Sequence, residues 1–144
     1  PVTILISIDG FRPDYRARGV TPNLDALAAS GISAAMRPSF PSKTFPNHWT
    51  LVTGLRPDRN GIVSNSMEDV ARPGVTFTME NSKDPFWWNE AEPLWVTAER
   101  SGVRSATLFW PGSNVAWGGT TKGGHGDPTG GVRPEDWWPF DMAV

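Results

Sequence analysis

Thr44 lies in a loop bounded by prolines and has the surroundings that a nucleophile for phosphoryl transfer needs. Its hydroxyl lies close to a predicted helix N-terminus, whose unpaired N–H groups and positive dipole end attract phosphate oxygens. Asp9 ends an apolar run and precedes a glycine, which suits a carboxylate that binds a cation beyond a strand's carboxyl end. A threonine hydroxyl is a weak nucleophile until a base or a metal lowers its pKa. The two residues together suggest a metal-activated threonine that attacks a phosphoryl group.

Each candidate residue also has a simpler structural explanation. Asp9 can hydrogen-bond its own loop, and Thr44 can be an ordinary helix cap, because Ser, Thr and Asp are the usual caps. Asn65 can donate its amide to a phosphoryl oxygen or can serve as a turn residue. Phe45 can stack on a base or an acyl group, or it can fill the core. At the level of single residues these alternatives stay open.

The chain has only two histidines, His48 and His125, too few to complete the metal site that such chemistry needs. We expect His48 to be a packing and hydrogen-bonding residue on a short helix, and His125 to be solvated in a glycine-rich loop. Because the chain has no cysteine, its remaining metal ligands are Asp, Glu, His and hydroxyl oxygens.

The composition is that of one globular domain. The chain has 144 residues, 19% of them charged and 38% hydrophobic, which excludes a disordered polymer. A net charge of −2 gives no electrostatic case for a nucleic-acid polymer or an anionic membrane as partner. No apolar run approaches the roughly 18 residues of a membrane span, so we expect none.

The first forty residues predict strands and a helix in alternation. Residues 2–8 are apolar and β-branched, which is typical of a strand buried on both faces of a parallel sheet. Thr21 and the proline after it predict a helix start, and Gly31 predicts its end. Residues 32–36 predict a second strand.

The stretch after the proline-rich loop predicts a short helix over residues 47–53. Pro46 suits its first turn, and Gly54 ends it. Residues 56–61 have the composition of a turn, and residues 62–63 predict a brief strand.

The second half alternates less regularly. Residues 68–92 predict an irregular insertion or an exposed hairpin, which the Trp87-Trp88 pair would bury. Residues 93–101 predict a helix, residues 103–110 a strand, and residues 118–131 a flexible glycine-rich loop. The order of the elements indicates a layered α/β domain.

Several linked motifs, in order over about residues 2–115, resemble one family, the nucleotide pyrophosphatase/phosphodiesterases of the alkaline phosphatase superfamily. They are Ile6-Ser7-Ile8-Asp9-Gly10-Phe11-Arg12, Thr21-Pro22-Asn23-Leu24, Pro41-Ser42-Lys43-Thr44-Phe45-Pro46-Asn47-His48, Leu51-Val52-Thr53-Gly54-Leu55-Arg56-Pro57, Asn60-Gly61-Ile62-Val63-Ser64-Asn65-Ser66-Met67, Glu92-Pro93-Leu94-Trp95 and Trp110-Pro111-Gly112-Ser113.

The resemblance implies a layered α/β/α alkaline-phosphatase-like domain with a central, mostly parallel sheet. It implies a hydrolase with two Zn²⁺ ions that cleaves small-molecule phosphodiesters or pyrophosphates, exported to the periplasm or secreted. Thr44 would be the nucleophile that forms a phosphoryl-threonine, and Asp9 would ligate the zinc that activates Thr44. Asn65 and the Thr44 backbone N–H would bind a phosphoryl oxygen, and Phe45 would line the substrate pocket.

The chain departs from the family pattern in its ligands. Family members draw most zinc ligands, including an Asp-His pair, from positions farther along the chain, and no such pair occurs here. We therefore interpret residues 1–144 as the N-terminal portion of one catalytic domain, whose remainder lies on a separate piece. One alternative is an incomplete domain that binds phosphate ligands without turnover. Another is a different superfamily hydrolase, sulfatase-like or a monoester phosphatase.

Overall fold

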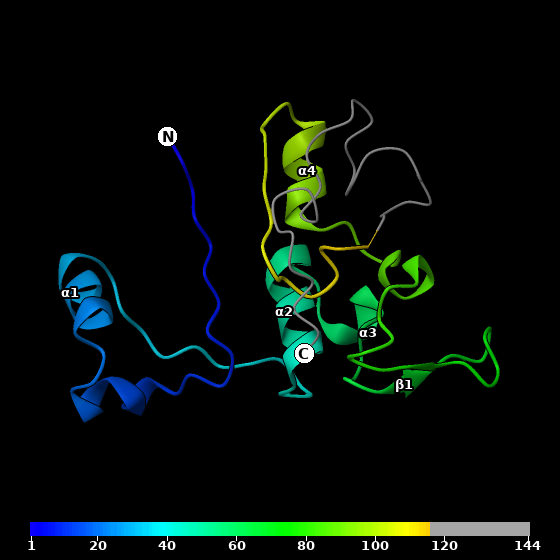
Figure 1. Ribbon diagram of the computed structural model, residues 1–144, viewed down its shortest axis with the longest axis horizontal. Helices are drawn as coiled ribbons and strands as arrows, with labels where there is room; N and C mark the ends of the chain where they lie inside the picture. The colour runs from blue at the N-terminus through cyan, green and yellow to red at the C-terminus, as the bar shows by residue number, and fades with distance from the viewer. Residues whose placement is uncertain (116–144) are drawn as a thin grey trace. The chain divides into compact units, whose positions relative to one another are not determined.

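The computed structural model describes residues 1–115, which fall into two compact units, Pro1–Arg37 and a unit that begins at Pro38. The 3₁₀-helices are labelled η. In chain order (Figure 1) the elements are η1 (Pro13–Arg18), α1 (Pro22–Ser30), α2 (Thr44–Thr53), α3 (Pro57–Asn60), β1 (Met67–Glu68), β2 (Thr76–Phe77), η2 (Pro85–Trp88) and α4 (Leu94–Arg100). The predicted loop at residues 118–131, with His125, lies outside the described residues.

The Pro1–Arg37 unit contains the predicted first helix. α1 begins at Pro22 and ends before Gly31, so the start and stop signals in the sequence are confirmed. Thr21 occupies the N-cap position, but its side chain makes no capping hydrogen bond. An ion pair joins η1 to α1: Arg16 Nε lies 2.8 Å from Asp25 Oδ1. No residue of this unit is buried.

Two predicted strands of the Pro1–Arg37 unit are not formed. Residues 2–8 and 32–36 belong to no strand. Their apolar side chains are exposed: Ile4 is 76% exposed and Ile32 is fully exposed. A β-branched run sets a preference for extended backbone, but a strand also requires a neighbour that completes its hydrogen bonds.

The prediction of strands at residues 62–63 and 103–110 is also wrong. Phe109 has a φ of 55°, which interrupts extended backbone, and Ser105 Oγ donates to the Trp95 carbonyl on α4. Within residues 1–115 the sheet consists of β1 and β2, which pair antiparallel with Met67 opposite Phe77. The described residues therefore do not confirm the layered parallel sheet.

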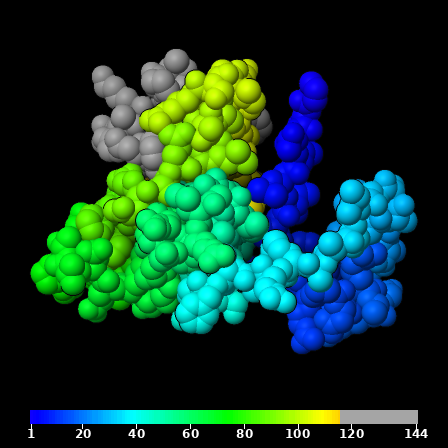
Figure 2. Space-filling model, turned by 180° about the vertical axis from the view of Figure 1, so that it is seen from behind, coloured from blue at the N-terminus to red at the C-terminus, as the bar shows by residue number. Residues whose placement is uncertain are grey.

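Large aromatic side chains form the core of the unit after Pro38. Trp49 of α2 meets Trp88 of η2 edge to face at a centroid distance of 4.9 Å, and Trp88 is 1% exposed. Phe77 of β2 packs 5.7 Å from the same Trp88 ring. Rings of this size bury roughly 150–250 Å² each and favour edge-to-face contacts. In Figure 2 the residues coloured from green to yellow-green form one continuous mass.

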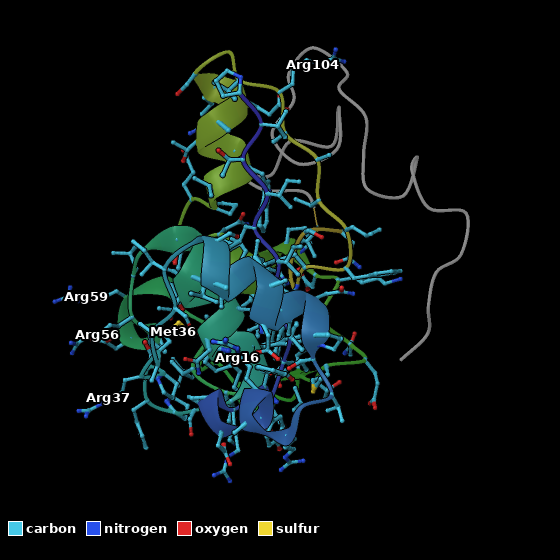
Figure 3. All side chains as sticks on the ribbon, turned by 90° about the vertical axis from the view of Figure 1, so that its left-hand side faces the viewer. Arg16, Met36, Arg37, Arg56, Arg59 and Arg104 are labelled. Atoms are coloured by element: carbon cyan, nitrogen blue, oxygen red, sulfur yellow. The ribbon has the colours of Figure 1, made fainter. Side chains whose placement is uncertain are left out.

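Both short helices that follow α2 pack against it. α3 contacts α2 directly, and so does α4. Asn60, at the end of α3, is fully buried and donates from Nδ2 to the Leu55 carbonyl at 2.9 Å. The charged side chains of this turn, Arg56 and Arg59, point outward (Figure 3). The core and these contacts fix both ends of α2, the helix that carries Thr44.

Candidate active site

Thr44 is the first residue of α2, whose predicted start was three residues too late. Pro46 lies in the first turn, where backbone N–H groups have no acceptor within the helix, so the lack of an N–H in proline costs no helical hydrogen bond. The helix ends as predicted, because Gly54 adopts a left-handed φ of 69° and donates to the Thr50 carbonyl. Thr44, a half-buried residue, therefore belongs to the positive end of the helix itself, and not to the loop before it.

Asn65 holds this helix end from twenty residues away. Its Oδ1 accepts a hydrogen bond from the Phe45 N–H at 2.9 Å. A residue that only formed a local turn would not make this contact. The Nδ2 group of Asn65 carries two donor hydrogens that the contact with Phe45 does not use. The structure thus brings Asn65 to the N-terminus of α2 beside Thr44.

Asn47 is a site residue that the sequence analysis missed. Its Oδ1 accepts from the Ser39 N–H at 2.8 Å, and its Nδ2 donates to the carbonyls of Pro41 and Lys43 at 2.9 Å each. The available signal was an asparagine in the first helical turn, where Asn side chains commonly bond nearby backbone. The loop that leads to Thr44 is therefore tied to α2 by one side chain.

Phe45 is a core residue. It is 8% exposed, and its ring lies 5.7 Å from that of Phe77 and 5.9 Å from that of Trp88. This arrangement agrees with the alternative that Phe45 fills the core. Contact between Phe45 and a substrate stays a prediction.

His48 is buried beneath the first turn of α2. Its Nδ1 lies 2.7 Å from the Thr44 carbonyl oxygen, so Nδ1 carries the hydrogen and donates. Its ring meets that of Trp110 edge to face at 5.3 Å, and Trp110 Nε1 donates to the His48 carbonyl. These contacts match the expected packing and hydrogen-bonding role.

Asp9 lies in the Pro1–Arg37 unit, whereas Thr44 lies in the other unit. It precedes a turn in which Gly10 has a φ of 67° and the Phe11 N–H donates to the Ile8 carbonyl. Metal binding by Asp9 stays a prediction. Within residues 1–115 no three Asp, Glu or His side chains gather as a metal site would require, so these residues alone do not fit a complete zinc site.

No helix among the described residues is long and apolar enough to cross a membrane. For the rest of the chain the absence of a membrane span stays a prediction.

Solved structures with a similar fold include murine ectonucleotide pyrophosphatase/phosphodiesterase 5. The TM-score is 0.74 at 38% identity, over 79% of this chain and 31% of the murine chain. An inactive variant of the same murine protein, with a threonine replaced by alanine and in complex with AMP, matches with the same TM-score at 37% identity.

Curated relatives are similar over most of this chain. A pyrophosphatase/phosphodiesterase of Schizosaccharomyces pombe, described as uncharacterized, is 53% identical over 115 residues, which are 78% of this chain and 24% of the relative. Ectonucleotide pyrophosphatase/phosphodiesterase family member 3 of Bos taurus is 43% identical over 124 residues, 83% of this chain and 14% of the relative. The chain thus spans a quarter or less of the length of these two relatives.

The family profile described as type I phosphodiesterase / nucleotide pyrophosphatase matches residues 3–143. That range includes the helix with Thr44, the Asn65 contact and the turn at Asp9. The chain belongs to the type I phosphodiesterase / nucleotide pyrophosphatase family.

Proposed function

We propose that the protein hydrolyses phosphodiester or pyrophosphate bonds of nucleotides or related small molecules, with Thr44 as the nucleophile. The observation that carries this proposal is the N-terminus of α2, which begins at Thr44 and is held by Asn65 through the Phe45 N–H. Further support comes from the names of the relatives and from the inactive threonine-to-alanine variant of the murine protein that binds AMP.

In the proposed reaction the Thr44 oxygen bonds to phosphorus while the bond from phosphorus to the leaving oxygen breaks. The hydroxyl proton passes to solvent, and the leaving oxygen takes a proton from solvent. Water then attacks the phosphoryl-threonine, which releases the phosphoryl group and restores the hydroxyl. Asn65 Nδ2 would donate to a non-bridging oxygen, and the positive end of α2 would stabilise the added negative charge.

We also propose that two Zn²⁺ ions take part, with Asp9 and Thr44 among their ligands. Two oxygen donors fall short of the three or four protein ligands of a usual zinc site, so the remaining ligands would lie beyond the described residues. When bound, zinc would supply a lowered pKa for the threonine hydroxyl. The relatives named as ectonucleotide enzymes support a periplasmic or secreted location.

The test combines three measurements on the purified full-length protein: intact mass, zinc content, and hydrolysis of a chromogenic nucleotide diester. Turnover with about two zinc ions per active unit, lost on chelation and restored by zinc, supports the proposal. A second polypeptide in the active sample would identify the source of the missing ligands. Turnover that survives complete zinc removal would contradict the zinc assignment.

A second candidate function is binding of phosphate-containing ligands without hydrolysis. The observation that favours it is the lack of a three-ligand cluster within residues 1–115. A zinc-free protein that binds AMP but turns over no diester would establish it. Faster cleavage of a phosphate monoester or a sulfate ester than of the diester would instead indicate another hydrolase of the superfamily.

A further inference from the structure

The loop over residues 39–43 has no helix or strand to satisfy its backbone, and Asn47 does so instead. The Asn47 carboxamide uses all of its principal hydrogen-bonding groups on this loop. Its oxygen accepts from the Ser39 N–H at 2.8 Å, and its two amide hydrogens serve the carbonyls of Pro41 and Lys43. A backbone bond from the Asn47 N–H to the Lys43 carbonyl, 3.2 Å long, adds to the same attachment.

Thr44 therefore lies between two asparagine contacts. Asn47 holds the residue before it, through the Lys43 carbonyl, and Asn65 holds the residue after it, through the Phe45 N–H. The two contacts fix the peptide groups on both sides of the Thr44 side chain. A displacement of a reacting group by about 1 Å can reduce a rate about 10²-fold.

We infer that Asn47 is a positioning residue for the Thr44 hydroxyl, an inference that rests on the proposed function. It acts through the backbone of residues 39–43 and does not itself touch the substrate. Its loss should lower kcat and leave KM nearly unchanged, because the Thr44 hydroxyl is misplaced while the binding groups remain.

Asn60 provides a matched control within the same fold. It makes the same kind of contact at the other end of α2: Nδ2 donates to the Leu55 carbonyl at 2.9 Å, and Oδ1 accepts from the Ile62 N–H at 3.0 Å. Both asparagines support backbone next to α2, but only Asn47 supports the backbone next to Thr44. A purely structural role would therefore give the two substitutions the same kinetic effect.

The experiment compares Asn47→Ala, Asn47→Asp and Asn60→Ala in the full-length protein, each assayed well below its own unfolding temperature. We expect kcat on the nucleotide diester to fall about 10- to 100-fold in Asn47→Ala, with KM within about threefold. Asn47→Asp keeps the acceptor for Ser39 but loses both donors, so its kcat should also fall. Asn60→Ala should lower the unfolding temperature and leave kcat of the folded protein unchanged. Unchanged kcat in both Asn47 variants, or an equal loss in Asn60→Ala, would overturn the inference.

Amide hydrogen exchange separates failure of this inference from failure of the proposed function. Asn47→Ala should remove the protection of the Ser39 N–H, and Asn60→Ala should preserve it. If the wild-type protein hydrolyses none of the diesters, the proposed function fails and Asn47 has no reaction to position. If the wild-type protein is active and Ser39 stays protected in Asn47→Ala, the Asn47 contact is not what orders the loop, and the inference alone fails.

Discussion

Both the unit that begins at Pro38 and the Pro1–Arg37 unit contain apolar segments, but the two units differ in whether these segments are buried. In residues 38–115 apolar side chains from the helices, from β2 and from the segments between them form a core rich in aromatic rings. In Pro1–Arg37 the apolar residues of the extended segments are exposed. A helix satisfies its own backbone, whereas a strand depends on segments elsewhere. Apart from the short β1–β2 pair, regular structure in residues 1–115 therefore forms where the hydrogen bonds are local.

The largest contrast expected between the two units concerns catalysis. Thr44→Ala should reduce hydrolysis of a nucleotide diester at least about 10⁴-fold, with the fold unchanged, because the nucleophile is lost. Asp9→Asn should lower the zinc content. The checks are steady-state kinetics and metal analysis, with Ser42→Ala as the control hydroxyl, expected to keep full activity. Turnover in Thr44→Ala would remove Thr44 from the proposed role, and unchanged zinc in Asp9→Asn would do the same for Asp9.

Truncation of apolar side chains tests the difference in burial directly. Trp88→Ala should lower the free energy of unfolding by about 3–5 kcal/mol, because it opens a cavity in the aromatic core. Ile4→Ala should change it by less than about 0.5 kcal/mol, since Ile4 is exposed. Urea unfolding of the two variants measures both values. A cost for Ile4→Ala close to that of Trp88→Ala would mean that residues 2–8 are buried in solution, and the contrast would not hold.

Two glycines with a left-handed backbone, one in each unit, differ in how closely other atoms pack around them. At Gly112, with a φ of 82°, an added Cβ would lie 2.5 Å from Cε3 of Trp88. At Gly19, with a φ of 70°, it would meet no atom within 4 Å. Gly19→Ala should cost about 1–2 kcal/mol of backbone strain, and Gly112→Ala should cost about 1–3 kcal/mol more from overpacking. Thermal unfolding of the pair checks the difference, and equal costs would show that the Trp88 ring can move aside.

The smallest contrast concerns one ion pair in each unit. Arg16 contacts Asp25 at 2.8 Å and Arg72 contacts Asp84 at 2.7 Å, all with partly exposed side chains. Arg16→Gln and Arg72→Gln should each cost less than about 1 kcal/mol, and less in high salt. Arg72→Gln should cost more, because Arg72 also lies 4.5 Å above the Phe86 ring. Urea unfolding at low and high salt measures both, and a larger cost for Arg16→Gln would contradict this order.

Short-range signals allowed much of the helical structure to be predicted from the sequence. Pro22 and Gly31 bound α1, Gly54 ends α2, and Gly102 follows the end of α4 as expected. Each of these signals depends on backbone geometry within one or two residues. Strand formation could not be predicted from such local signals, because a strand's partner is not encoded in the strand's own residues.

The sequence predicted which residues form the candidate site, but not the contacts that hold them in place. Thr44 and Asn65 are brought to the same helix end, as the motifs suggested. The hydrogen bonds of the Asn47 side chain to the loop depend on how residues 39–43 turn back toward α2. The burial of Phe45 depends on the rings of Phe77 and Trp88. Neither arrangement follows from the spacing of residues along the chain.

The distribution of aromatic residues gives the residues after Arg37 an optical signal of their own. All eight tryptophans follow Arg37, and the only tyrosine, Tyr15, precedes it. The close edge-to-face contact of Trp49 and Trp88 should give a strong near-ultraviolet circular dichroism band and an emission spectrum that shifts when the core opens. Light absorbed by tryptophan alone therefore reports on the residues after Arg37. Unfolding of these residues can be followed in an unlabelled sample without a contribution from the Pro1–Arg37 unit.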